Sequence, residues 1–224
     1  MVQTIKENIE KIQNKIKRKD ITLVAVSKYQ SIESIEEAYA CGLRDFGENY
    51  IQEWQTKCTQ LSHLKDIRWH IIGHLQKNKA KFINENVYCL QSLDSIVFAK
   101  ELEKKYLSLS KKLNVLVQLQ VDKNDAHKSG VSRENFSELC SYIKKSNKLN
   151  LIGFMGIGPN TNDVQKLKQL YNEFTQNCYY EWNSTQNKPV MSLGMSQDLE
   201  VALECGSNMV RVGTAIFGER HVSY

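Results

Sequence analysis

The sequence predicts an α/β fold: a single (β/α)8 TIM barrel formed by residues 1–224, with an extra N-terminal helix. Apolar, β-branched runs alternate with helical patterns from Thr22 to the C-terminus, as in a parallel sheet covered by helices. Eight such units fit a chain of 224 residues, and 41% hydrophobic residues suffice for a sizeable core. A doubly wound sheet stays the alternative, because periodicity does not reveal whether a sheet closes.

The first predicted element is a helix that precedes the barrel. Ile5, Ile9, Ile12 and Ile16 recur at spacings of three and four residues, so they share one face of an amphipathic helix. We expect this helix to pack on the outside of the barrel.

Strands and helices then follow in alternation, and the segment between the third and fourth strands has no clear pattern. Gly42 and Gly206 fit positions just past a helix end, which supports the neighbouring boundaries. The predicted strands are Thr22–Val26, Leu43–Gly47, Arg68–Ile72, Val87–Leu90, Val115–Val121, Leu151–Met155, Pro189–Ser192 and Met209–Val212. The predicted helices are Ser34–Ala40, Tyr50–Leu64, Ser95–Leu107, Glu134–Lys145, Val164–Cys178 and Asp198–Cys205.

Composition argues against several classes of protein. The net charge of +5 is spread over lysines that alternate with glutamates, and the densest basic run, Lys77, Lys79 and Lys81, is too short for a nucleic-acid site. Six cysteines lie far apart without a C-x-x-C pair, as expected for reduced thiols in a cytoplasmic protein. No signal peptide or membrane span is predicted. His70 and His74 straddle Gly73 at a strand end, so we expect no metal site.

Lys28 is the first candidate for chemistry. It follows the buried run Val24–Ser27, and functional groups of a barrel collect where its strands end. Partial burial or a neighbouring cation lowers the pKa of a lysine and frees its amine for attack on a carbonyl group. On position alone, a lysine that ends the strand in solvent remains the alternative.

The seventh and eighth strands are each followed by a loop suited to a phosphate group. The segment Leu193–Asp198 contains a glycine and leads into a helix, with Ser196 suited to the N-cap. Gly213 permits a close backbone approach after strand eight, and Thr214 adds a hydroxyl group. Phosphate sites of barrels often form from these two loops, so the pair predicts a phosphate cradle.

Arg211 lies between the candidate lysine and the cradle. Its guanidinium group stays protonated at ordinary pH and only donates hydrogen bonds, so it would hold an acceptor nitrogen unprotonated. If Arg211 touched only a carboxylate, it would form a structural ion pair instead.

Six ordered segments together carry a resemblance to a known family. They are Ala25–Lys28, Phe46–Tyr50, Trp69–Lys79, His127–Gly130, Leu193–Asp198 and Arg211–Gly218. The set spans nearly the whole chain and resembles the YggS/PROSC family of pyridoxal phosphate homeostasis proteins. That family is related to the N-terminal barrel of fold-type III enzymes such as alanine racemase.

The resemblance implies pyridoxal 5′-phosphate (PLP) as the cofactor, held as a Schiff base on Lys28. Ser196, Gly213 and Thr214 would bind its phosphate group, Arg211 would face the pyridine nitrogen, and Asn49 would line the pocket near the ring. The implied function is a non-catalytic PLP-binding protein in PLP homeostasis. It would have no catalytic residues and no metal.

Two features of the resemblance disfavour turnover. An arginine partner opposes protonation of the ring nitrogen, which weakens the cofactor as an electron sink. Racemases of this fold type place a tyrosine from a second domain opposite the lysine, whereas this sequence ends at Tyr224, ten residues beyond Thr214. We therefore expect a monomer that gives PLP to apo PLP-dependent enzymes and binds neither nucleic acid nor membranes.

Two other functions stay open. One is a PLP-dependent amino-acid racemase whose second base is not recognised in the sequence. The other is an aldolase-like barrel in which Lys28 attacks a sugar-phosphate carbonyl while the cradle holds the substrate phosphate.

Overall fold

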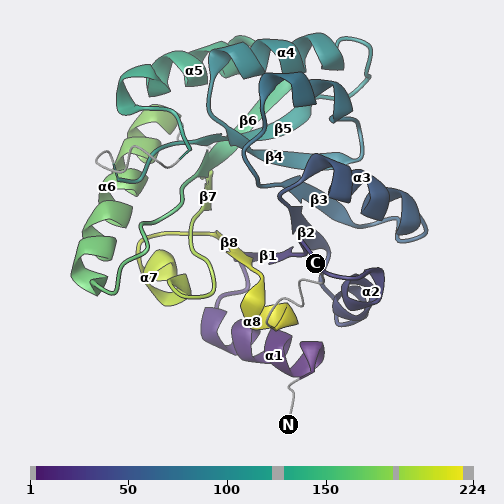
Figure 1. The fold of residues 1–224 in the computed structure, drawn as a ribbon. Coiled ribbons are helices and arrows are strands. Elements are labelled where there is room, and N and C mark those ends of the chain that lie inside the picture. Colours follow the sequence, from purple (N-terminus) through teal and green to yellow (C-terminus); the bar gives the residue numbers. More distant parts are fainter. Residues whose placement is uncertain (1–3, 123–128, 184–186, 219–224) are drawn as a thin grey trace.

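Eight parallel strands form a closed barrel in the computed structural model, which describes residues 4–122, 129–183 and 187–218 (Figure 1). Each strand pairs with the next along the chain, and β8 pairs with β1 to close the ring. The strands are β1 Thr22–Val26, β2 Asp45–Glu48, β3 Arg68–Ile71, β4 Val87–Leu93, β5 Leu113–Gln118, β6 Leu149–Met155, β7 Val190–Ser192 and β8 Met209–Val212. The predicted (β/α)8 barrel is confirmed, and the doubly wound alternative is wrong.

Helices lie around the outside of the ring of strands (Figure 1). The helices are α1 Ile5–Ile16, α2 Ile32–Ala40, α3 Ile51–Gln60, the 3-10 helix η1 Lys77–Phe82, α4 Ile96–Tyr106, α5 Arg133–Lys145, α6 Val164–Trp182, α7 Leu199–Glu204 and α8 Thr214–Phe217. Helix η1 occupies the segment without a clear sequence pattern.

The N-terminal helix α1 is built as predicted. Thr4 caps it through a capping box with Glu7, so two otherwise unpaired backbone donors are satisfied. Ile9, Ile12 and Ile16 are buried, and α1 packs against α2, α7 and α8. Figure 1 shows α1 beside α8 on the outside of the barrel.

Strand β2 begins two residues later than predicted. Gly42 has a φ of +97°, and the N–H of Leu43 donates to the carbonyl oxygen of Ala38, so Leu43 still belongs to the end of α2. Gly206 ends α7 in the same way, with a φ of +95°. Both glycine predictions are confirmed.

Strand β5 leaves the barrel at Gln118, although the apolar pattern continues to Val121. Leu119 pairs instead with Val131, and both Leu119 and Val121 are buried. The continued apolar run therefore reports burial and not membership of the sheet. The remaining strands and helices differ from the predicted bounds by no more than four residues at either end.

The core has two layers, as expected for a barrel whose sheet is covered on both faces. A small cluster inside the barrel contains Val24, Leu116 and Met155, and a larger cluster fills the space between strands and helices. Buried polar side chains share the barrel interior, and this is the feature on which the site depends.

Several further findings apply to the described part of the chain. It contains no helix that is long and apolar enough to cross a membrane. It also contains no group of three or more His, Cys, Asp or Glu side chains placed to hold a metal ion. None of the six cysteines forms a disulfide bond, and four of them are buried. His127 and Lys128, part of the family resemblance, lie outside the described residues.

Candidate ligand site at the mouth of the barrel

All six residues predicted to bind the cofactor line one cavity, with a volume of about 920 Å³. They are Lys28, Asn49, Ser196, Arg211, Gly213 and Thr214. They come from β8 and from the segments that follow β1, β2, β7 and β8, so the fold gathers them at the carboxyl ends of the strands. Barrels place their functional groups at this end, and small-molecule sites commonly measure about 300–1,000 Å³.

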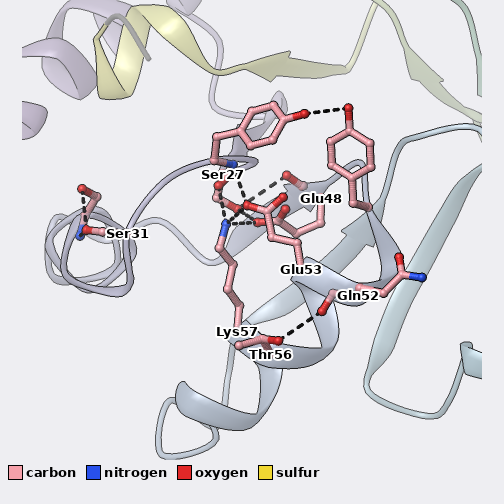
Figure 2. Close-up of polar contacts among 11 residues, drawn as sticks. Ser27, Ser31, Glu48, Gln52, Glu53, Thr56 and Lys57 are labelled. Carbon is pink, nitrogen blue, oxygen red and sulfur yellow. Dashed lines mark hydrogen bonds and ion pairs between the residues drawn. The ribbon is translucent and has the colours of Figure 1, made fainter. Parts of the chain in front are cut away.

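The backbone on both sides of Lys28 is held by side chains of α3 (Figure 2). The Lys57 amine donates to the carbonyl oxygen of Ser27 at 2.6 Å, and the N–H of Tyr29 donates to Glu53 Oε1 at 2.5 Å. Tyr29 has a φ of +61°, an uncommon conformation for a bulky residue. Two charged contacts thus fix the turn that presents Lys28 to the cavity.

The same amine joins two carboxylates in a buried group that we call the Lys57 cluster, formed by Ser27, Glu48, Glu53 and Lys57. Lys57 Nζ lies 2.9 Å from Glu48 Oε1 and 2.7 Å from Glu53 Oε1, and Ser27 Oγ donates to Glu48 Oε1 at 2.7 Å. Figure 2 shows these groups converging between α3 and the ends of β1 and β2.

Within the Lys57 cluster, the surroundings of Glu48 disfavour its ionised form. Its side chain is fully buried, and Oε2 has no hydrogen-bond partner among the described residues. Burial raises the pKa of Glu48 from 4.5 to about 7, against the opposing effects of Lys57 and Ser27. Neither Glu48 nor Lys57 was predicted as a site residue.

Asn49 lines the cavity, and its backbone lies in close contact with Gly73. A Cβ atom added to Gly73 would stand 2.2 Å from the carbonyl oxygen of Asn49. Ser92 Oγ donates to the carbonyl oxygen of Gly73 at 2.7 Å and holds the other side of this contact. Only glycine allows the two loops to approach this closely.

We expect Gly73→Ala to weaken binding at the cavity by displacing Asn49, and to lower the free energy of unfolding by about 1–3 kcal/mol. Urea unfolding and ligand titration measure the two effects. Gly206→Ala is the control, since its added methyl group meets nothing within 4 Å and only backbone strain remains. Unchanged ligand affinity in Gly73→Ala would contradict this role of the contact.

Arg211 is buried, with 4% of its surface exposed, and lines the cavity from β8. Its Nη1 donates to the carbonyl oxygen and the hydroxyl of Ser192 at 2.7 and 2.6 Å, and its Nη2 donates to the carbonyl oxygen of Gly156 at 2.9 Å. Within the described residues it forms no ion pair with a carboxylate, so the ion-pair interpretation is wrong. Burial lowers the pKa of Arg211 to about 10, but this value is still well above neutral pH, so the guanidinium group stays charged.

The structure corrects the role predicted for Ser196. Helix α7 begins at Leu199 with Asp198 as its N-cap residue, so Ser196 does not cap it. Asp198 holds this loop through its carboxylate, which accepts from the N–H of Met195 at 2.5 Å and from the hydroxyl of Tyr171. Ser196 Oγ instead accepts from the N–H of Ala215 at 3.4 Å and links the two loops of the predicted cradle.

Gly213 brings this cradle against β1. A Cβ atom added to Gly213 would lie 3.3 Å from both the Cβ atom and the carbonyl oxygen of Val26, two residues before Lys28. With Thr214 opening α8 directly afterwards, the site combines an amine, two hydroxyl groups and a guanidinium group. This set of donors fits a phosphorylated aldehyde with a ring acceptor, and therefore fits PLP.

Comparison with known proteins gives one family. The family model for the N-terminal domain of alanine racemase matches residues 1–221. A pyridoxal phosphate homeostasis protein from Pasteurella multocida is 36% identical, over 98% of this chain and 99% of that protein. The protein of the same name from Helicobacter pylori (strain ATCC 700392 / 26695) is 38% identical, over 94% of each chain.

Solved structures agree with the sequence relatives. PipY from Synechococcus elongatus, solved with PLP bound, has a TM-score of 0.87 and 28% identity, and the match covers 96% of this chain and all of that one. Alanine racemase from Corynebacterium glutamicum has a TM-score of 0.75 at 16% identity, a likeness of fold alone. The match covers 62% of that longer chain.

Proposed function

Because the chain belongs to the alanine racemase N-terminal domain family, and within it to the pyridoxal phosphate homeostasis proteins, we propose that it binds PLP and acts in PLP homeostasis. The observation that carries the proposal is that Lys28, Arg211 and the predicted phosphate cradle line one cavity. The cradle consists of Ser196, Gly213 and Thr214. PLP bound to PipY, which shares 28% of its residues with this chain, supports the same ligand.

Each cavity residue has a distinct part in the proposal. Lys28 supplies the amine that anchors the cofactor, and Ser196, Gly213 and Thr214 hold its phosphate group. Arg211 donates toward the ring nitrogen, and Asn49 lines the pocket near the ring. When bound, PLP would supply an aldehyde group that can react with an amine and a ring that can act as an electron sink.

The residues around the cavity favour a carrier over a racemase. Among the described residues that line it, Lys28, Asp198 and Arg211 are the titratable ones. Asp198 already accepts two hydrogen bonds, and Tyr171, which donates one of them, has a pKa raised by burial and by Asp198. Apart from Lys28, Asp198 is the one described lining residue that could serve as a base, and its carboxylate already holds the loop at Met195. Arg211 opposes protonation of the ring nitrogen.

A transfer assay tests the carrier function. The PLP-loaded protein is mixed with an apo PLP-dependent enzyme in the presence of a scavenger of free PLP, and recovery of the enzyme's activity is followed. Recovery that the scavenger does not suppress supports a carrier that gives PLP to apo-enzymes. Recovery no faster than with free PLP under the same scavenger would contradict it.

A racemase is the second candidate, because the chain shares its fold with alanine racemase. Incubation of the loaded protein with L-alanine or L-serine, followed by chiral chromatography, distinguishes the two functions. Formation of the D-isomer at the rate of an enzyme would overturn the carrier proposal. We also propose that residues 1–224 act as one cytoplasmic, monomeric unit, and a stable dimer in light scattering would contradict the last point.

A further inference from the structure

A row of buried hydrogen bonds crosses the barrel interior and ends at Arg211. Arg211 Nη1 donates to Ser192 Oγ at 2.6 Å, and Ser192 Oγ donates to Gln91 Oε1 at 2.7 Å. Gln91 Nε2 lies 2.9 Å from His70 Nδ1, and His70 Nε2 lies 2.9 Å from Asp45 Oδ1. We call these five residues the Asp45–Arg211 chain. His70, Gln91 and Ser192 are fully buried.

The direction of the chain is fixed at its Asp45 end. Burial alone would raise the pKa of Asp45, but hydrogen bonds from Arg68 and His70 hold it below its ordinary value. Arg68 binds the Asp45 carboxylate in a bidentate contact, with Nε 2.8 Å from Oδ1 and Nη2 2.5 Å from Oδ2. An ionised carboxylate only accepts hydrogen bonds, so His70 Nε2 is the donor.

In the middle of the Asp45–Arg211 chain, one arrangement gives every proton an acceptor. A neutral imidazole that donates through Nε2 accepts through Nδ1, so the Gln91 amide nitrogen faces His70 and its oxygen faces Ser192. The Ser192 hydroxyl gives its proton to Gln91 and accepts from Arg211, whose guanidinium group only donates. A flipped amide would place the Gln91 nitrogen against Ser192 and leave the Ser192 proton without an acceptor among the described residues. It would also lose the contact of Gln91 Nε2 with Met209 Sδ at 3.3 Å.

This arrangement decides which edge of Arg211 is left for a ligand. Nη1 is held by Ser192, and one N–H of Nη2 is held by the carbonyl oxygen of Gly156. The Nε–H and the second N–H of Nη2 have no acceptor within the described residues, and Arg211 lines the cavity. The chain thus sets both the plane of the guanidinium group and the edge that it presents.

We propose that Ser192, Gln91 and His70 are positioning residues that aim the Nε edge of Arg211 at the ring nitrogen of the bound cofactor. The inference rests on the proposed function for its ligand. Its structural part, the direction of the hydrogen bonds in the Asp45–Arg211 chain, is independent of any ligand. The two parts therefore need separate measurements.

The tautomer of His70 tests the direction of the chain in protein without cofactor. Long-range proton–nitrogen NMR of histidine-labelled protein distinguishes the two neutral tautomers and the charged ring. The wild type is expected to show the Nε2–H tautomer at His70. In Gln91→Glu, a carboxylate would face Nδ1, so the ring should become doubly protonated. The Nδ1–H tautomer or a charged ring in the wild type would overturn the inference, whether or not PLP binds.

Ser192→Ala tests the effect on the ligand, with Ser207→Ala as the matched control. Ser207 is equally buried, but its hydroxyl bonds to the backbone of Met191, Leu193 and Met209 and does not touch the chain. Loss of one charge-assisted hydrogen bond to Arg211 should weaken PLP binding about tenfold. It should also shift the absorbance maximum of bound PLP, because the surroundings of the ring nitrogen change.

The outcomes separate the inference from the proposed function. Ser207→Ala is expected to lower the melting temperature and to leave the affinity and spectrum of PLP unchanged. If Ser192→Ala behaves in the same way, Ser192 is only structural and the inference is overturned while PLP binding stands. If the wild type itself fails to bind PLP, the proposed function fails and the positioning role falls with it, even with the predicted tautomer. If Ser192→Ala does not fold, Gln91→Leu takes its place in both measurements.

Discussion

Lys57→Met is expected to lower the free energy of unfolding by about 3–5 kcal/mol at pH 8, because it leaves two carboxylates of the Lys57 cluster without their cation. Lys57 is 5% exposed and contacts Glu48, Glu53 and the backbone before Lys28. Urea unfolding followed by circular dichroism measures the change. The loss should shrink at lower pH, since the carboxylates can then neutralise themselves by binding protons.

The control for this variant is Lys104→Met. Lys104 also pairs with a glutamate, Glu101, but its side chain is 70% exposed. Pairs of this kind contribute little, so no measurable change is expected. Equal effects of the two substitutions would show that the Lys57 cluster does not stabilise the turn at Lys28.

Glu48 gives the second large effect, a dependence of stability on pH. Its pKa is raised from 4.5 to about 7 in the folded protein, so between these values the folded state binds more protons than the unfolded state. The free energy of unfolding should therefore fall as pH rises from about 5 to 8, by about 3 kcal/mol from this group alone. Glu48→Gln removes the titration, and its profile should lack this fall.

Urea unfolding at several pH values between 5 and 8 measures both profiles. Glu101→Gln, on the exposed surface of α4, serves as the control and should reproduce the wild-type profile. A wild-type protein whose stability rises over this interval, with Glu48→Gln following it, would contradict the assignment.

The fold was accessible from the sequence because local and global signals agree. The isoleucine spacing of α1, the glycines after α2 and α7, and the apolar strands each point to the same barrel. The predicted strand bounds were wrong where an apolar residue is buried without joining the hydrogen bonds of a strand. Val121 is buried without belonging to a strand, and Leu43 is apolar but completes the end of α2.

The candidate site was only partly accessible. Position at strand ends indicated Lys28 and the two loops, and the family resemblance added Asn49 and the orientation of Arg211. Ser196 was misplaced as a helix cap, because the carboxylate of Asp198, two residues later, holds the loop and the helix begins after it. A side chain's partners across the chain decide such details, and a single sequence does not record them.

The sequence did not predict the supporting roles of the polar groups around the site. Lys57 and Glu53 have the spacing of an ordinary exposed pair on a helix, although the structure buries Lys57 against the backbone of Ser27, the residue before Lys28. His70 and Gln91 are separated by 21 residues and join only when β3 and β4 pair inside the barrel. Contacts of this kind depend on strand register, which the apolar pattern does not specify.

The central claim is that Lys28 is the anchor of PLP, and one measurement tests it directly. The wild type and Lys28→Ala are incubated with PLP, reduced with borohydride and digested, and the peptides are mapped by mass spectrometry. We predict one reduced PLP adduct, on the peptide that contains Lys28, and none in the variant. An adduct on another lysine in the wild type, or no adduct at all, would contradict the account.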